Sequence, residues 1–294
     1  MPVVRSNGIE IAYEERGEGE PLVLATGIGM QLVGWPDAFL DRLAARGFRV
    51  IVFDHRDVGM STKLTHAGVP PVQRLIARAL LGLPVEAPYT LFDMADDVVG
   101  LLDALGLPKA HLAGVSMGGM VAQAAAIRHG ARWKSLVSLM SHPGGKLLTI
   151  SKPYAAMALL GKLPRTREEA IQRQVEFFRT VGSPGFARDD SLVREAAGRA
   201  YDRSFNPPGF ARHFAAILAT GDMRSRLRDV KTPTLVLHGA DDPLVRPSHG
   251  KDTAKNIPGA KLRIIDGWGH DLAVGVWDLL ISAIAEHAKQ HTAR

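Results

Sequence analysis

Residues 110–127 read Ala-His-Leu-Ala-Gly-Val-Ser-Met-Gly-Gly-Met-Val-Ala-Gln-Ala-Ala-Ala-Ile. An apolar run leads into the pentapeptide Gly114–Gly118, and a helical pattern of small apolar residues follows it. A Gly-x-Ser-x-Gly segment between a strand and a helix has the sequence form of a nucleophile elbow, a tight turn that presents a serine hydroxyl. Glycines suit such a turn because they lack the Cβ atoms that would obstruct it. The stretch therefore predicts a strand–turn–helix unit with Ser116 as the candidate nucleophile.

The alternation of strand and helix continues along most of the chain. Continuous apolar runs are typical of strands that are buried on both faces, as in a parallel sheet covered by helices. The expected strands are 2–5, 9–15, 21–26, 48–53, 109–113, 135–140, 234–238 and 261–265. The expected helices between them are 37–46, 91–105, 117–129, 247–256 and 272–289. The pattern predicts an α/β fold with a mostly parallel central sheet flanked by helices.

Residues 143–228 interrupt this alternation. They contain no convincing strand pattern and instead predict helices over 154–161, 167–181, 190–201 and 208–220, with prolines between them. Strand-like runs resume at Thr234, so a separate C-terminal domain does not fit. We therefore expect a core formed by residues 1–142 and 229–294, with residues 143–228 inserted into it as a helical cap.

The composition limits the class of protein. At 294 residues and 46% hydrophobic, the chain can bury a large core. It has no cysteine, which excludes disulfides, cysteine-ligated zinc and thiol nucleophiles. The N-terminus has no long apolar segment and no stretch is apolar enough to cross a bilayer, so we expect a cytoplasmic protein that does not engage a membrane. No nucleic-acid recognition motif is present.

The positive charge is concentrated in the predicted cap. The whole chain has a net charge of +6, whereas residues 143–228 hold 15 basic and 8 acidic residues, a net charge of +7. A basic surface can attract anionic substrates or an acidic partner. The alternative, which we favour, is a set of solvated arginine-rich helices.

A serine hydroxyl needs a general base, commonly a histidine that a carboxylate holds in the correct tautomer. The expected strand 234–238 runs into Gly239-Ala-Asp241-Asp242-Pro, and the next strand runs into Gly267-Trp-Gly-His270. Both segments follow the carboxyl end of a strand, the edge at which open α/β sheets build their sites and at which Ser116 lies. His270 is therefore the candidate base, and Asp241 or Asp242 is the candidate acid.

Together, Gly-x-Ser-x-Gly, Gly-x-x-Asp-Pro and Gly-x-Gly-His, in this order, resemble the α/β-hydrolase superfamily over nearly the whole chain. A looser similarity links the chain to capped bacterial esterases of the aclacinomycin methylesterase type. It rests on residues 54–61, which have the pattern Asp-x-Arg-x-x-Gly-x-Ser, and on residues 33–36. The resemblance implies the α/β-hydrolase fold with an inserted cap. It also favours Asp242 over Asp241, because the family acid lies three residues after the glycine and directly before proline.

The resemblance also implies an oxyanion hole built from backbone N–H groups. One donor is Met117, directly after the serine. The other belongs to the loop Thr26-Gly-Ile28-Gly29, in which we place it at Ile28, with Gly29 as the alternative. Thr26 replaces a histidine that is usual in the family, which removes one contact that braces this loop but leaves the backbone donors in place.

Further side chains near the expected site have structural or lining roles. We predict a buried ion pair between Asp54 and Arg56, helix capping by Asp271, and a core position for His238. The candidate pocket-lining residues are Gly29, Trp35, His142 and Trp268; for the two tryptophans we favour a core position over a place in the pocket wall.

These residues predict a serine hydrolase that cleaves small to medium carboxylic esters through an acyl-enzyme on Ser116, without a cofactor or a metal. Its partner would be a small-molecule ester. The same three residues also serve perhydrolases, lactonases, amidases and carbon–carbon bond hydrolases in resembling families. A non-enzymatic ligand receptor on the same scaffold is the third alternative.

Overall fold

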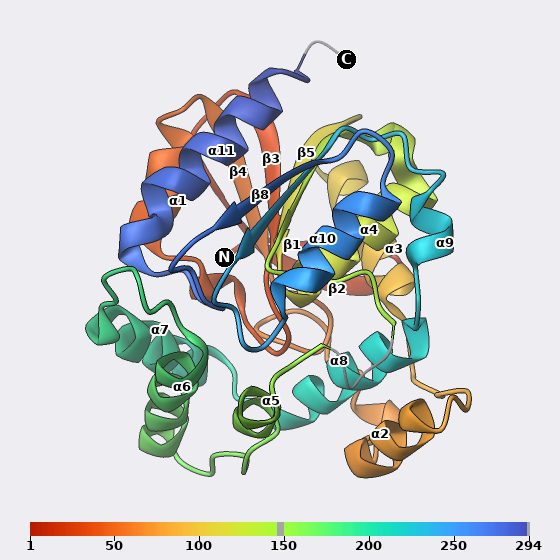
Figure 1. The fold of residues 1–294 in the computed structure, drawn as a ribbon, viewed down its shortest axis with the longest axis vertical. Helices are drawn as coiled ribbons and strands as arrows, with labels where there is room; N and C mark the ends of the chain where they lie inside the picture. Colours follow the sequence, from red (N-terminus) through yellow and green to blue (C-terminus); the bar gives the residue numbers. More distant parts are fainter. Residues whose placement is uncertain (146–149, 293–294) are drawn as a thin grey trace.

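The computed structural model describes residues 1–145 and 150–292, and it is built around an eight-stranded sheet (Figure 1). The strands lie in the order β1-β2-β4-β3-β5-β6-β7-β8. They are β1 (Val3–Ser6), β2 (Ile9–Arg16), β3 (Glu20–Ala25), β4 (Phe48–Phe53), β5 (Ala110–Val115), β6 (Trp133–Leu139), β7 (Thr234–Gly239) and β8 (Lys261–Ile265). In this order, every neighbouring pair from β4 through β3 to β8 is parallel. At the other edge, β1 pairs antiparallel with β2, and β2 pairs antiparallel with β4.

The antiparallel edge arises from the turn between β1 and β2. Asn7 and Gly8 both have positive φ, at 48° and 79°. These are the residues that tolerate such angles, and two of them in succession match a tight hairpin. The central strands β5 and β7 are buried along their whole length because both of their faces are covered, whereas the edge strand β8 is exposed over its first three residues.

Helices cover both faces of the sheet. Helices α1 (Asp37–Ala44) and α11 (Trp277–Lys289) pack on one face, and α3 (Leu91–Ala104), α4 (Met117–His129) and α10 (Pro247–Asn256) pack on the other (Figure 1). The predicted α/β fold with a mostly parallel sheet is thus confirmed. The helix predicted from residue 272 begins only at Trp277, because a 3₁₀ turn over Val274–Val276 precedes it.

The remaining helices lie at one end of the sheet, in the lower part of Figure 1. They are α2 (Val72–Leu80), α5 (Pro153–Leu159), α6 (Arg167–Val181), α7 (Asp190–Arg203) and α8 (Pro207–Thr220); the short α9 (Arg224–Leu227) leads toward β7. Between β6 and β7, the described residues form helices and no strand. The division into a core and a cap over 143–228 stays a prediction, and residues 146–149 of that range lie outside the described residues.

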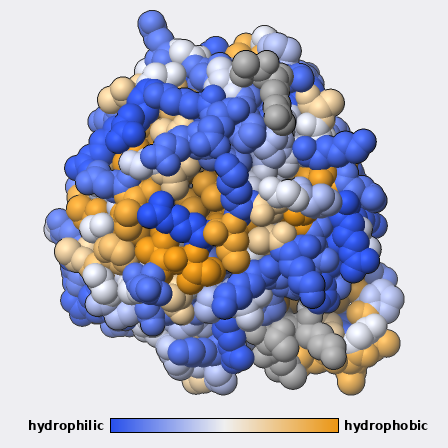
Figure 2. All heavy atoms as spheres, turned by 45° about the horizontal axis from the view of Figure 1, so that its top comes forward, coloured by the Kyte–Doolittle hydropathy of each residue, from blue (hydrophilic) through white to orange (hydrophobic). Residues whose placement is uncertain are grey.

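The surface is mostly hydrophilic on the face that Figure 2 presents, where polar side chains surround an area of gathered hydrophobic ones. In the described part of the chain, no helix has the length and apolar character that a bilayer crossing requires.

Candidate active site

Ser116 lies in a strained turn between β5 and α4. Its φ and ψ are 54° and −120°, in a region that side chains rarely adopt. The surrounding glycines permit this conformation: a Cβ on Gly114 would collide with the backbone of Gly118, and a Cβ on Gly118 would collide with the Ala25 carbonyl. The predicted strand–turn–helix unit is present, and it holds the Ser116 hydroxyl at the carboxyl edge of the sheet.

A chain of hydrogen bonds joins Ser116 to the two residues predicted as its partners. His270 Nε2 lies 3.1 Å from Ser116 Oγ, and His270 Nδ1 lies 2.7 Å from Asp242 Oδ2. Asp242 and His270 are both buried, with exposed fractions of 2% and 5%, whereas Ser116 is partly exposed to the adjoining cavity. Three residues from three strand ends therefore meet with the spacing that proton transfer requires.

Asp242, and not Asp241, is the carboxylate that contacts His270. The turn after β7 directs Asp242 inward, where its Oδ1 accepts hydrogen bonds from the backbone N–H groups of Leu244 and Val245 at 2.9 and 2.8 Å. Its Oδ2 is thereby left for the histidine. Asp241 points away and accepts from Gly267 N at 2.8 Å, in an exposed position. Nearby, His238 is fully buried, as expected for a core residue, and its Nε2 donates to Val245 O.

The loop that carries His270 is held by the segment after α6. His270 N donates to Val181 O at 2.7 Å. Asp271 accepts from Ser183, through Oγ at 2.5 Å and through the backbone N–H at 3.1 Å. The prediction that Asp271 caps a helix is therefore wrong: α11 begins six residues later, and the carboxylate instead fastens the histidine loop to a segment 88 residues away.

The candidate oxyanion donors belong to the two segments next to Ser116, the start of α4 and the loop after β3. Met117 is the first residue of α4, so its N–H has no partner within the helix. In the loop after β3, Gly29 N–H donates to His213 Nδ1 at 3.1 Å and is thereby occupied. Ile28 lines the cavity beside Ser116. The geometry thus favours Ile28 over Gly29 as the second donor.

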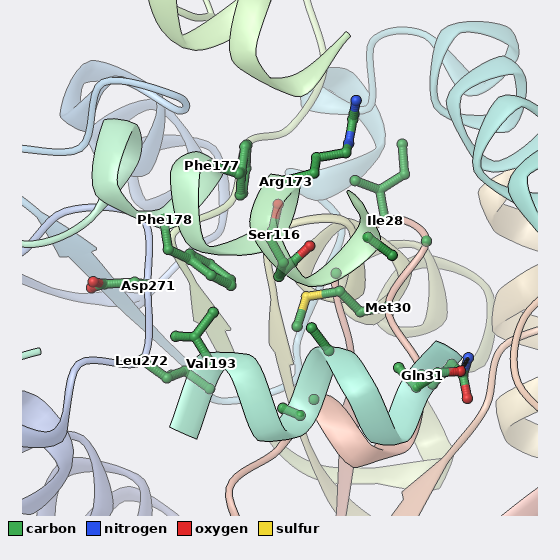
Figure 3. A pocket seen from close by; sticks show the side chains of 18 of the residues that line it. Ile28, Met30, Gln31, Ser116, Arg173, Phe177, Phe178, Val193, Asp271 and Leu272 are labelled. Carbon is green, nitrogen blue, oxygen red and sulfur yellow. Dashed lines mark hydrogen bonds between the residues drawn. The ribbon is translucent and has the colours of Figure 1, made fainter. Parts of the chain in front are cut away.

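A cavity of about 350 Å³ opens beside Ser116 and is walled by the loop after β3, α6, α7, the start of α8 and the segment before α11. Figure 3 shows Ser116 between Phe177 and Phe178 of α6 on one side and Ile28 on the other. The lining is mainly apolar, with Leu159, Leu163, Leu192, Val193, Phe205, Phe210, Leu244 and Leu272 among its residues. This wall suits an uncharged, apolar ligand.

Two polar side chains of the wall are bonded within the protein. Gln31 donates to the Ala200 and Ser204 carbonyls at 2.7 Å. The Arg173 guanidinium donates to the Leu159 and Lys162 carbonyls, and burial lowers the pKa of Arg173. These side chains shape the cavity rather than offer a charge to a ligand.

Of the four residues predicted to line the pocket, the structure brings only Gly29 to the cavity wall. Trp35 stacks on Phe39 in the core beneath α1, at a ring distance of 5.7 Å. Trp268 is fully buried, and its indole N–H donates to Asp271 O. His142 accepts from Gly144 N, and burial lowers its pKa to about 3, so it is neutral. All three follow a strand or turn near the site, but their side chains turn inward.

The predicted ion pair between Asp54 and Arg56 is also wrong. Arg56 instead pairs with Asp97 of α3 through two hydrogen bonds of 2.6 Å. Asp54 accepts from the backbone N–H groups of Leu32 and Met60 and pairs with Arg203 of α7 at 3.0 Å. Asp54 and Arg56 are only two residues apart, but their side chains point in different directions and pair with different helices.

Comparison with known proteins identifies the family. The family described as the alpha/beta hydrolase fold matches residues 20–274, and the chain belongs to it. A rhodomycin D methylesterase from Streptomyces sp. (strain C5) is 28% identical over 99% of this chain and 100% of that protein. A 2-hydroxy-6-oxononadienedioate/2-hydroxy-6-oxononatrienedioate hydrolase from Burkholderia vietnamiensis is 27% identical over 89% and 85% of the two chains.

Among solved structures, the fold matches the enol-lactonase from Burkholderia xenovorans LB400, with a TM-score of 0.72 and 23% identity over 98% of this chain and all of that one. The resemblance to the α/β hydrolases, including methylesterases of the aclacinomycin type, is thus confirmed. Within residues 1–145 and 150–292, no group of three or more His, Cys, Asp or Glu side chains is arranged to hold a metal ion.

Proposed function

We propose that this protein hydrolyses uncharged carboxylic esters by nucleophilic catalysis. The observation that carries the proposal is the hydrogen-bonded chain Asp242–His270–Ser116, whose serine end opens into an apolar cavity. The similarity to a rhodomycin D methylesterase over the whole chain supports an ester as the substrate.

The geometry supports a two-step mechanism. His270 Nδ1–H donates to Asp242, which leaves Nε2 unprotonated and able to accept the proton of Ser116 Oγ as the oxygen attacks the ester carbonyl. The N–H groups of Met117 and Ile28 stabilise the oxyanion of the tetrahedral intermediate. His270 then protonates the leaving alcohol, and the acyl-enzyme on Ser116 remains. Water, deprotonated by the same histidine, releases the acid and restores the hydroxyl.

The cavity limits the substrate class. A volume of about 350 Å³ accommodates a small to medium ester but not a long-chain lipid together with its alcohol. The apolar wall accepts the larger portion of the ester, and a methyl ester needs little room on the alcohol side. We therefore propose a methyl or other short-alcohol ester of an apolar acid.

A second candidate is hydrolysis of another carbonyl substrate with the same three residues. The similarity to a 2-hydroxy-6-oxononadienedioate/2-hydroxy-6-oxononatrienedioate hydrolase supports this alternative. That substrate is a dianion by name, and the described wall of the cavity offers no unoccupied cation close to Ser116. We therefore rank the ester first.

The test is a substrate panel combined with an active-site probe. We expect a fluorophosphonate to label one serine, identified as Ser116 by peptide mapping, and to abolish turnover in proportion to labelling. Methyl esters of apolar acids should be hydrolysed with higher kcat/KM than amides or oxo-dienoate dianions of similar size. Labelling without turnover of any ester would exclude the esterase proposal but retain the nucleophile, and no labelling would exclude both.

The basic helices around the cavity lead to a separate prediction. Their arginines are largely paired with nearby carboxylates on the surface, including Arg167–Asp202, Arg179–Asp190, Arg199–Asp37 and Arg224–Asp222. We therefore expect kcat/KM for a neutral and for an anionic ester to respond equally when ionic strength rises from about 10 to about 150 mM, which shortens the Debye length from about 30 to about 8 Å. A selective fall for the anionic ester would show that the excess positive charge steers substrates.

A further inference from the structure

The loop that carries the oxyanion donor is held from outside by a buried histidine of α8. His213 Nδ1 accepts the hydrogen bond of Gly29 N–H at 3.1 Å, and Nε2 lies 2.7 Å from Arg56 O. His213 is 184 residues from Gly29 in the sequence and is fully buried. One imidazole therefore joins the loop after β3 to the turn after β4 (Phe48–Phe53).

The two contacts determine the tautomer of His213. Gly29 N–H is a donor, so Nδ1 has to be the unprotonated acceptor, and Nε2 has to carry the hydrogen that it donates to the Arg56 carbonyl. Burial lowers the pKa of His213 to about 4, so the neutral ring that this arrangement needs is present at neutral pH. Both ring nitrogens are thereby satisfied inside the protein.

The hydrogen bond to His213 gives the N–H groups of Gly29 and Ile28 different surroundings. Because Gly29 N–H points to His213, it is unavailable to a substrate, while Ile28 lies on the cavity wall beside Ser116. Gly29 has a φ of 67°, which lets the chain reverse here, and a Cβ at this position would lie 3.0 Å from the Phe210 ring. Thus α8 both covers the loop and fixes its orientation.

Further along the same segment, Gln31 bonds α7 and Leu32 N–H bonds Asp54, while another contact lies within the loop itself. Thr26 Oγ1 donates to Met30 O at 3.1 Å and closes the ends of the loop on each other. That bond sets the shape of the loop, but it does not fix its position against the rest of the molecule. The bond from Gly29 to His213 supplies a fixed point on another element directly after Ile28.

We propose that His213 is a positioning residue of the oxyanion hole: by taking up Gly29 N–H, it fixes the loop so that Ile28 N–H faces the oxyanion. The inference rests on the proposed function. Through this residue, the placement of α8 against the core determines how well the tetrahedral intermediate is bound.

Two variants separate this role from a merely structural one. His213→Asn retains an amide oxygen close to the position of Nδ1 and so keeps the acceptor for Gly29 N–H. His213→Gln retains a donor close to the position of Nε2 and leaves Gly29 N–H without its acceptor. Loss of an oxyanion donor typically lowers kcat about 10²–10³-fold, so a displaced donor in His213→Gln should lower kcat about 10–100-fold with little change in KM. His213→Asn should retain most of kcat.

Both variants are assayed below their measured melting temperatures, with kcat referred to folded protein. Equal losses in the two variants, or an unchanged kcat in His213→Gln, would overturn the inference. Failure of the proposed function is seen separately, because the wild-type protein would then either turn over no ester or not be labelled by a fluorophosphonate at Ser116.

A measurement on the wild-type protein keeps the inference testable if a variant does not fold. With ¹⁵N label in glycine, isoleucine and methionine, binding of phenylboronic acid as a tetrahedral adduct of Ser116 should shift the amide signals of Ile28 and Met117. Gly29, bonded to His213, should shift much less. A dominant shift of the Gly29 amide would show that this group, and not Ile28, faces the oxyanion.

Discussion

Replacing Ser116 or His270 with alanine is expected to lower kcat for ester hydrolysis by about 10⁶, and replacing both should lower it no further, as in serine hydrolases whose triad acts as one unit. The reason lies in the hydrogen bond of 3.1 Å between His270 Nε2 and Ser116 Oγ. Without the hydroxyl, the base has no proton to take, and without the base, the hydroxyl is a poor nucleophile at neutral pH.

The measurement is the initial rate of hydrolysis of an activated aryl ester, and folding of each variant is checked by circular dichroism. His129→Ala is a matched control. His129 is the last residue of α4 and pairs with Asp96 away from the elbow, so kcat of this variant should equal that of the wild-type protein. If Ser116→Ala retained a tenth of the activity, the acyl-enzyme proposal would be wrong. If the double variant lost the product of the two single effects, the two residues would not act as a unit.

The catalytic candidates could be predicted from sequence because each is marked by local pattern. Ser116 is marked by glycines that the turn requires, and Asp242 and His270 by turns at the ends of two apolar strands. A parallel sheet brings such ends together, so the fold class and the site follow from the same information. The structure joins these three residues although 154 positions separate His270 from Ser116.

What could not be predicted are side-chain contacts between segments that are distant in the sequence. Asp271 seemed to be a helix cap, since nothing in its neighbourhood indicated Ser183. Asp54 and Arg56 seemed to be partners because they are close in sequence, yet each pairs with a different helix. Side-chain direction and packing of distant helices decide these cases, and neither has a local sequence signal.

The ion pair between Asp57 and Arg212 is the most deeply buried of these contacts. Arg212, on α8, lies 2.7 Å from Asp57 in the turn after β4, and their side chains are 1% and 0% exposed. Burial alone would raise the pKa of Asp57, but hydrogen bonds from Arg212, Tyr89 and the Leu64 backbone outweigh it and hold that pKa below its ordinary value. Asp57 is therefore ionised at neutral pH and needs its partner.

Removing one charge of this pair is expected to destabilise the protein by about 3–5 kcal/mol, because an uncompensated charge then remains buried. Arg212→Met leaves the carboxylate without its cation. Asp57→Asn leaves the guanidinium without its anion but keeps the shape and the positive φ of 70° that asparagine tolerates. In the double variant neither charge remains, so its loss of stability should be smaller than the sum of the single losses by about 0.5–3 kcal/mol.

The urea midpoints of the four proteins measure this coupling, provided that unfolding is reversible and its denaturant dependence is unchanged. Arg167→Met is the matched control, since Arg167 forms a comparable ion pair with Asp202 whose side chains are 51% and 57% exposed. Water already solvates that pair, so its removal should leave the midpoint unchanged. Strict additivity in the Asp57–Arg212 cycle would mean that the two charges do not stabilise each other. Equal midpoints for Arg212→Met and Arg167→Met would mean that burial adds nothing to the contribution of this ion pair.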